Sequence, residues 1–183
     1  MNRYEIKMVL IGDEDTGKSK FCEKLLHRNN NINFDEYLPT IGGSFLRSTK
    51  NFQHRTFNIN IWDTAGQERF QPLIIMYLPE TNIVLIFYNP LKKKSFERVK
   101  VLLNTAKEYL KNDNNIIYAL IGSKYDLKLE SNEEENVVEE EALEFADKNN
   151  LLFFHLSNKE KYNNYTNEIM GKVLNEYIKK KNI

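Results

Sequence analysis

Residues 12–19, Gly-Asp-Glu-Asp-Thr-Gly-Lys-Ser, match the pattern G-x-x-x-x-G-K-[ST]. In that pattern backbone N–H groups and one lysine surround the phosphates of a nucleotide. An apolar run over residues 4–11 precedes the motif, and a stretch without Pro or Gly follows it over residues 20–27. A strand that leads through a glycine turn into a helix directs the partial positive charge of the helix N-terminus at a bound anion. This context favours a phosphate-binding loop, although the two glycines alone would also fit an ordinary turn.

A second run, residues 62–70, has the sequence Trp-Asp-Thr-Ala-Gly-Gln-Glu-Arg-Phe. It closely resembles the switch II segment of Ras-superfamily small GTPases, and most closely that of the Rab branch. Three further matches follow the order of that family: residues 37–42 are similar to switch I, residues 123–126 to the guanine-recognition element, and residues 156–159 to the last base-contacting loop. The resemblance extends from Ile6 to the final predicted helix.

The resemblance implies a site for GTP or GDP with Mg²⁺ as cofactor. Its phosphate contacts fall on Asp15, Thr16, Gly17, Lys18, Ser19, Thr40 and Gly66. The metal contacts fall on the hydroxyls of Ser19 and Thr40 and, through water, on Asp63. Gln67 occupies the position that orients the attacking water, and we expect slow hydrolysis that depends on an activating protein, because no arginine lies between Phe34 and Pro39.

The guanine contacts implied by the resemblance fall on Phe34, Ser123, Lys124, Asp126, Ser157, Asn158 and Lys159. Asp126 can accept hydrogen bonds from guanine N1–H and the exocyclic amine, a donor pair that adenine lacks. Lys124 is expected to pack over the base, and the backbone N–H of Asn158 to meet guanine O6. Counting back from Thr40 gives Asn33 at the position of the stacking aromatic, so we assign that role to the neighbouring Phe34.

Two departures from the family pattern affect the expected biochemistry. Glu14 and Asp15 stand where small residues are usual, and their negative charge near the triphosphate predicts faster nucleotide release. Ser123 replaces the asparagine that braces the phosphate loop in relatives, and its shorter side chain predicts a weaker brace.

Three functions are compatible with these features. The leading one is a GTP-hydrolysing switch of Rab-like type that acts in membrane traffic through an exchange factor, an activating protein and effectors at the switch regions. The alternative is a GTP- or GDP-binding interaction module with little hydrolysis, which Glu14, Asp15 and Ser123 motivate. A P-loop kinase of small nucleotides is disfavoured, because residues 63–67 and 124–126 would have no role in it.

The order of elements predicts an α/β fold in three layers: a P-loop GTPase domain with a mostly parallel six-stranded sheet and about five helices. Near-continuous apolar runs over residues 82–88, 115–121 and 151–156 are typical of strands covered on both faces. Residues 45–50 and 56–61 are expected to pair as a hairpin around residues 51–55. Helices are predicted over residues 20–27, 94–111, 138–148 and 166–180.

Length and composition agree with one G domain over residues 1–183. The 26 basic residues balance the 26 acidic ones, which argues against a general nucleic-acid binder. No apolar segment reaches the roughly 18 residues that span a bilayer, so a cytoplasmic or peripheral endomembrane location is expected. The sequence stops at Lys181-Asn182-Ile183 without the prenylated cysteines typical of Rab proteins, so membrane association requires a missing tail or a partner.

The remaining chemistry-bearing residues favour structural interpretations. The single cysteine, Cys22, is expected to be a small buried apolar residue in the first helix. Residues 92–94, three consecutive lysines, are typical of a solvated face, with contact to anionic lipid as a less favoured alternative. The three histidines lack the spacing of a metal site or a catalytic pair.

Overall fold

The computed structural model describes residues 2–27, 42–67, 71–128, 136–157 and 165–183. Its centre is a six-stranded sheet in the order β2-β3-β1-β4-β5-β6. In chain order the strands are β1 (Asn2–Gly12), β2 (Gly43–Phe52), β3 (Arg55–Thr64), β4 (Ile83–Tyr88), β5 (Ile117–Gly122) and β6 (Leu152–His155). Only β2 runs antiparallel, against β3, and the other neighbouring pairs are parallel. The predicted mostly parallel six-stranded sheet is therefore confirmed.

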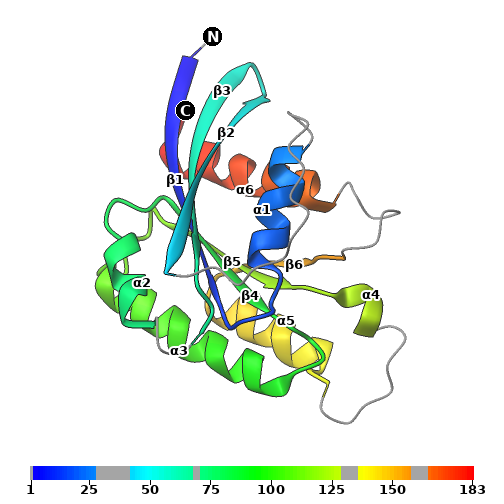
Figure 1. Cartoon of the computed structure of the whole chain (residues 1–183). Coiled ribbons are helices and arrows are strands. Elements are labelled where there is room, and N and C mark those ends of the chain that lie inside the picture. Colours follow the sequence, from blue (N-terminus) through cyan, green and yellow to red (C-terminus); the bar gives the residue numbers. More distant parts are fainter. Residues whose placement is uncertain (1, 28–41, 68–70, 129–135, 158–164) are drawn as a thin grey trace.

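The helices cover both faces of the sheet (Figure 1). They are α1 (Lys18–His27), α2 (Gln71–Tyr77), α3 (Lys93–Tyr109), α4 (Tyr125–Lys128), α5 (Glu139–Lys148) and α6 (Tyr165–Lys181). Side chains of α1 and α6 share one buried cluster with the sheet, and side chains of α2, α3 and α5 share another. Two hydrophobic clusters separated by one sheet give the predicted three layers.

The pattern of β1 explains why helices pack on both of its faces. Successive side chains of a strand point to opposite faces. Ile6, Met8 and Leu10 belong to the cluster of α1 and α6, and Val9 and Ile11 belong to the cluster of α2, α3 and α5. All five are fully buried, as a continuous apolar run predicts for a parallel strand with covered faces.

The predicted hairpin is present as β2 and β3, joined by a two-residue loop. Phe52 pairs with Arg55, which leaves Gln53 and His54 at the turn. Their φ angles are 47° and 60°. Positive φ at both central residues matches the right-handed twist of the flanking strands, and glycine or asparagine usually supplies it. The loop is therefore tighter than the expected residues 51–55 and carries backbone strain at two side-chain-bearing residues.

Two helices were not predicted from the sequence. The seven residues of α2 include the uniformly apolar run Leu73-Ile74-Ile75-Met76, which has no helical periodicity. Helix α4 is a single turn over Tyr125–Lys128. Ile74 is buried in the core, whereas Met76 is 69% exposed, so α2 leaves apolar surface in solvent.

Two further features of the described residues bear on the expectations above. Cys22 lies in α1 and is 1% exposed, which confirms the expected buried position. Burial raises the pKa of its thiol well above the ordinary value. Among the described helices, none is both long enough and apolar enough to cross a membrane.

The turn of the hairpin gives a test of stability. Replacing His54 by glycine should raise the free energy of unfolding by about 0.5–1 kcal/mol, because the relief of left-handed strain exceeds the extra chain entropy of glycine. Urea unfolding followed by circular dichroism measures the change. The control His54→Ala keeps the Cβ atom, so a gain of similar size in that variant would contradict the explanation by strain.

Candidate nucleotide-binding site

The phosphate loop begins where β1 ends and closes where α1 begins. Gly12 ends the strand with φ 150°, and a Cβ atom there would lie 2.4 Å from the carbonyl oxygen of Phe87. Gly17 has φ 82°, a conformation that glycine adopts without a steric penalty. Between them the hydroxyl of Thr16 donates to the carbonyl of Asp13 at 2.7 Å. The two motif glycines are therefore fixed by close backbone approach and by positive φ.

Lys18 is the most deeply buried charged group of this loop, with 6% of its surface exposed. Its ammonium donates to the carbonyls of Gly12 at 2.9 Å and of Asp13 at 2.7 Å. Burial lowers the pKa of Lys18 to about 8, although the carboxylates of Asp63 and Asp13 act in the opposite direction. A buried ammonium whose shortest hydrogen bonds within the described residues go to backbone carbonyls favours an anion beside it, as in a phosphate site.

Ser19 and Asp63 meet although they are 44 residues apart in the sequence. The Ser19 hydroxyl donates to Oδ2 of Asp63 at 2.6 Å, with Asp63 at the end of β3 and only 2% exposed. A hydroxyl and a carboxylate oxygen are the hard ligands that Mg²⁺ accepts, together with water and phosphate oxygens. No group of three acidic, histidine or cysteine side chains forms a metal site within the part of the chain that the structure describes. The donor set fits a magnesium ion that takes further ligands from a nucleotide.

The segment after β3 lies directly against the phosphate loop. The Thr64 hydroxyl donates to the carbonyl of Leu10 at 2.6 Å. A Cβ atom at Gly66 would lie 2.4 Å from the backbone nitrogen of Glu14 and 2.5 Å from the carbonyl carbon of Asp13. This contact requires glycine, and it holds the following Gln67 at the same edge of the sheet.

The two loops expected to bind guanine are joined by hydrogen bonds. The Ser157 hydroxyl donates to Oδ1 of Asp126 at 2.8 Å, and Asp126 is 8% exposed. The backbone N–H of Tyr125 donates to the carbonyl of Leu156 at 3.2 Å. One carboxylate oxygen of Asp126 is thus oriented by Ser157 within a sheltered position.

Ser123 is buried beside the phosphate loop. Its hydroxyl donates to the carbonyl of Tyr88 at 3.2 Å. A Cβ atom at Gly17 would lie 3.4 Å from Cβ of Ser123, so the two loops approach closely at this point. Ser123 therefore packs near the loop while its hydroxyl bonds the end of β4.

Sequence similarity decides the family of this site. A profile of the Ras family matches residues 7–179. Ras-related protein Rab-22A of Homo sapiens is 34% identical over 159 residues, covering 87% of this chain and 77% of that protein. Ras-related protein Rab-17 of Mus musculus is 30% identical over 178 residues, covering 97% and 78%. GTP-binding protein YPT1 of Saccharomyces cerevisiae is 34% identical over 155 residues, covering 84% and 70%. The chain belongs to the Ras family.

Membership in this family makes the chain a small GTPase, similar to Rab proteins but divergent from them. Proteins of the Ras family are nucleotide-dependent switches that bind GTP or GDP, generally with Mg²⁺. The expected resemblance is confirmed, and so is the expected P-loop GTPase fold. The roles of individual residues in this GTPase remain predictions.

Several of the predicted site residues of the GTPase lie outside the described residues. Thr40 and Phe34 fall within residues 28–41, and Asn158 and Lys159 fall within residues 158–164. The remaining predicted residues gather at the carboxyl edge of the sheet: Asp15, Thr16, Gly17, Lys18, Ser19, Asp63, Gly66, Gln67, Ser123, Lys124, Asp126 and Ser157.

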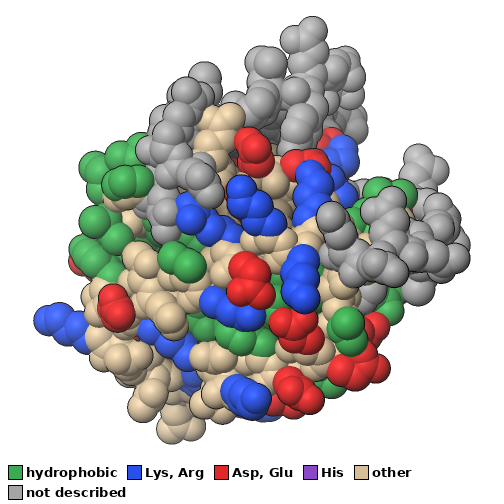
Figure 2. All heavy atoms as spheres, turned by 90° about the horizontal axis from the view of Figure 1, so that it is seen from below, with side chains coloured by type: hydrophobic (Ala, Val, Ile, Leu, Met, Phe, Trp, Pro, Cys, Tyr) green, Lys and Arg blue, Asp and Glu red, His purple; other side chains and the backbone are tan. Residues whose placement is uncertain are grey.

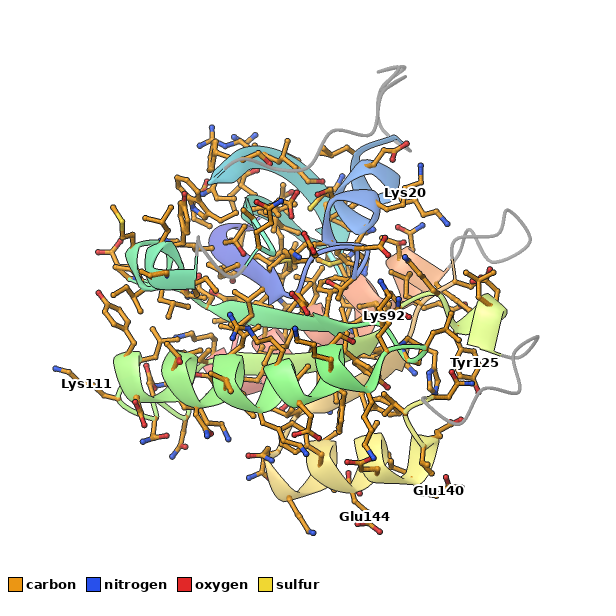
Figure 3. All side chains as sticks on the ribbon, turned by 60° about the horizontal axis from the view of Figure 1, so that its bottom comes forward. Lys20, Lys92, Lys111, Tyr125, Glu140 and Glu144 are labelled. Atoms are coloured by element: carbon orange, nitrogen blue, oxygen red, sulfur yellow. The ribbon has the colours of Figure 1, made fainter. Side chains whose placement is uncertain are left out.

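Lys92 makes a contact in the GTPase site that was not predicted from the sequence. Lys92 was interpreted as part of a solvated face, but its ammonium lies 3.5 Å from a carboxylate oxygen of Asp15, while its side chain is 60% exposed. Figure 3 shows Lys92 and Tyr125 towards the same end of the molecule, whereas Lys111 lies beyond the opposite end of α3. Only the position of Lys92 directly before α3, and thus beside the strand ends, hinted at this contact in the sequence.

The packing of Gly66 against the phosphate loop generates a prediction for this GTPase. Gly66→Ala should lower the rate of GTP hydrolysis about 10- to 100-fold, because the methyl group displaces the segment that carries Gln67. GDP affinity should change little. Single-turnover phosphate release and GDP titration measure the two effects.

Gly171→Ala in α6 is the matched control, since the nearest atom to a Cβ there is a ring carbon of Phe52 at 3.7 Å. It should leave hydrolysis unchanged. Equal hydrolysis by the parent and the Gly66→Ala variant would show that the tight contact does not matter for the reaction.

Proposed function

We propose that this chain is a GTP-hydrolysing switch of Rab-like type that acts in membrane traffic. The observation that carries the proposal is the convergence of Lys18, the Ser19–Asp63 pair and Gly66 on one phosphate loop. A site of this kind can sense whether a terminal phosphate is present, because the loop and the segment after β3 are in direct contact. The similarity to Rab proteins supports the part of the proposal that concerns membrane traffic.

Phosphate binding rests on the buried Lys18 and on the N-terminus of α1. The ammonium of Lys18 exchanges its bonds to loop carbonyls for bonds to phosphate oxygens, and the phosphate charge offsets the cost of its burial. The Mg²⁺ would be held by Ser19, Asp63 and Thr40. A bound Mg²⁺ would neutralise the charge that develops on the phosphate oxygens.

Hydrolysis is assigned to Gln67, which would orient water in line with the terminal phosphate. Gly66 would offer its N–H to the same phosphate. Hydrolysis removes that phosphate and so releases the segment after β3. Phosphoryl transfer requires mostly positioning and charge stabilisation. This chain supplies positioning, and we propose that an activating protein supplies the missing arginine.

An aromatic surface beside the switch segment fits the proposed effectors. Trp62 of β3 contacts Phe45 of β2 and Tyr77 of α2, with ring centroids 5.1 and 5.2 Å apart. Phe45 is 49% exposed and Met76 is 69% exposed. Such an apolar patch between two nucleotide-sensitive segments is a typical protein-binding surface.

Other partners and the location follow from the same proposal. In Figure 2, Lys and Arg side chains are mixed with Asp and Glu side chains over the face seen from below in Figure 1, which favours no nucleic-acid partner there. We propose that residues 1–183 act as one G domain in the cytoplasm. We also propose that it attaches to the cytosolic face of an endomembrane.

A second candidate is a GTP- or GDP-binding interaction module with little hydrolysis. It is favoured by the position of Glu14, whose backbone nitrogen lies directly against Gly66. The exposed Glu14 adds a negative charge to the part of the loop that contacts Gly66, the residue directly before Gln67. Single-turnover phosphate release with and without an activating protein distinguishes this module from the switch.

The proposed role of Asp126 predicts a change of base specificity. Asp126→Asn should weaken GTP binding roughly a hundredfold and strengthen XTP binding, because an amide can donate where the carboxylate only accepts. Competition of both nucleotides against a fluorescent analogue measures the affinities. Unchanged affinities for GTP and XTP would contradict the assignment.

Ser157→Ala is the matched control for that test. It removes the hydroxyl that orients Asp126 but leaves the carboxylate. GTP affinity should fall only a few-fold and XTP affinity should not rise. A switch to XTP in this variant would show that the specificity does not come from the chemistry of the Asp126 side chain.

The proposed role of Gln67 predicts a loss of turnover without a loss of binding. Gln67→Leu should lower single-turnover hydrolysis at least about tenfold and keep GTP affinity within a few-fold, because Gln67 aligns water and does not hold the nucleotide. Hydrolysis equal to that of the parent would favour the interaction module or another residue as the water-orienting group.

A further inference from the structure

The carboxylate of Asp15 joins the phosphate loop to the guanine side of the site. Its Oδ1 lies 2.6 Å from the ammonium of Lys124, and its Oδ2 lies 3.5 Å from that of Lys92. We propose that Asp15 is a positioning residue that holds Lys124 over the base and thereby slows nucleotide release. This inference rests on the proposed function, since it assumes that Lys124 packs on a bound guanine.

The neighbouring Ser123 does not use its hydroxyl to hold the phosphate loop. Its hydroxyl bonds the Tyr88 carbonyl in β4, while its Cβ lies against the position of Gly17. Ser123 therefore packs closely against the loop while its hydroxyl bonds the end of β4. The Asp15–Lys124 ion pair links the same two loops by charge: the phosphate loop supplies the carboxylate and the loop after β5 supplies the ammonium.

The backbone at both ends of the pair lies in the left-handed region. Asp15 has φ 56° and Lys124 has φ 55°. Aspartate tolerates this conformation better than most residues, whereas lysine adopts it only where surrounding contacts hold it. The short ion pair is such a contact, so it helps to fix the loop that carries Lys124 and Asp126.

The surroundings of the pair decide how strong it is. The side chain of Lys124 is 19% exposed and that of Asp15 is 52% exposed. A half-buried ion pair of this kind contributes more stabilising free energy than a fully exposed one, but the contribution remains small. Partial burial acts to raise the pKa of Asp15, but hydrogen bonds and charges from Lys124 and Lys92 outweigh it and lower the pKa. Asp15 is therefore ionised at neutral pH, with two cations beside its charge.

This arrangement distinguishes Glu14 from Asp15, two of the three acidic residues of the phosphate loop. Both were expected to repel the triphosphate and to speed release. Glu14 is exposed, and its side chain forms no ion pair with any residue of the described ranges. Asp15, in contrast, forms ion pairs with two lysines, Lys92 and Lys124. Anchoring the ammonium of Lys124 also pre-orders its flexible four-carbon stem, which lowers the entropy lost when the stem packs on a base.

Release of a fluorescent GDP analogue from Mg²⁺-loaded protein, chased with excess GDP, tests the inference. Asp15→Asn should release the analogue about three- to tenfold faster than the parent. Glu14→Gln removes the same charge from the adjacent position, and its release should be equal to that of the parent or slower. If Asp15→Asn also releases the analogue at the parental rate or more slowly, Asp15 is only a repulsive charge and the inference is overturned.

Two further variants test whether Asp15 acts through its lysines. Lys92→Gln removes the longer contact outside the phosphate and guanine loops, and should speed release about twofold. In a Lys124→Met background, Asp15→Asn should cause no further acceleration. An undiminished acceleration in that background would overturn the inference, because the effect would not pass through Lys124.

The same assay separates this inference from the proposed function. A parent that retains no GDP would overturn both. A parent that retains GDP, with an Asp15→Asn variant that behaves like Glu14→Gln, would overturn the inference and leave the switch intact.

Discussion

The site depends on the parallel pairing of β1 with β3 on one side and with β4 on the other. In this register Leu10 pairs with Asp63, and Gly12 pairs with Phe87. Parallel strands end at the same edge, so the phosphate loop, the carboxylate of Asp63 and the loop after β4 meet there. A shift of β3 by one residue would turn Asp63 to the other face and away from Ser19. The buried pattern of β1 that fixes the register therefore also fixes the chemistry.

The charged residues at this edge form two separate groups, one around Lys18 and one around Asp15. Lys18 is buried near carbonyls and the carboxylate of Asp63, and burial lowers its pKa to about 8. Asp15 is balanced by Lys124 and Lys92. Lys18 thus stays a buried cation beside the expected phosphate position, although the loop contains three acidic residues in its sequence, Asp13, Glu14 and Asp15.

Much of the fold was predictable because its signals are local. Apolar runs gave the strands, and the motif with its glycines gave the phosphate loop at the correct strand end. Helix α2 was not predicted, since its continuous apolar run lacks a period and its burial depends on the sheet beneath it. The ion pairs of Asp15 were not predicted either, because they join loops 77 and 109 residues apart, and only the folded sheet brings those loops together. These sequence separations are counted from Asp15 to Lys92 and to Lys124.

Cys22, enclosed between α1 and the sheet, has a practical consequence for spectroscopy. It is the single cysteine of the sequence, and its thiol is both shielded and held protonated by burial. Thiol reagents are attacked by an accessible thiolate, so a buried, protonated thiol reacts poorly with them. A cysteine introduced on the surface, for example beside either switch segment, would then carry a spin label or a dye at one defined place, without the need to replace Cys22 as well.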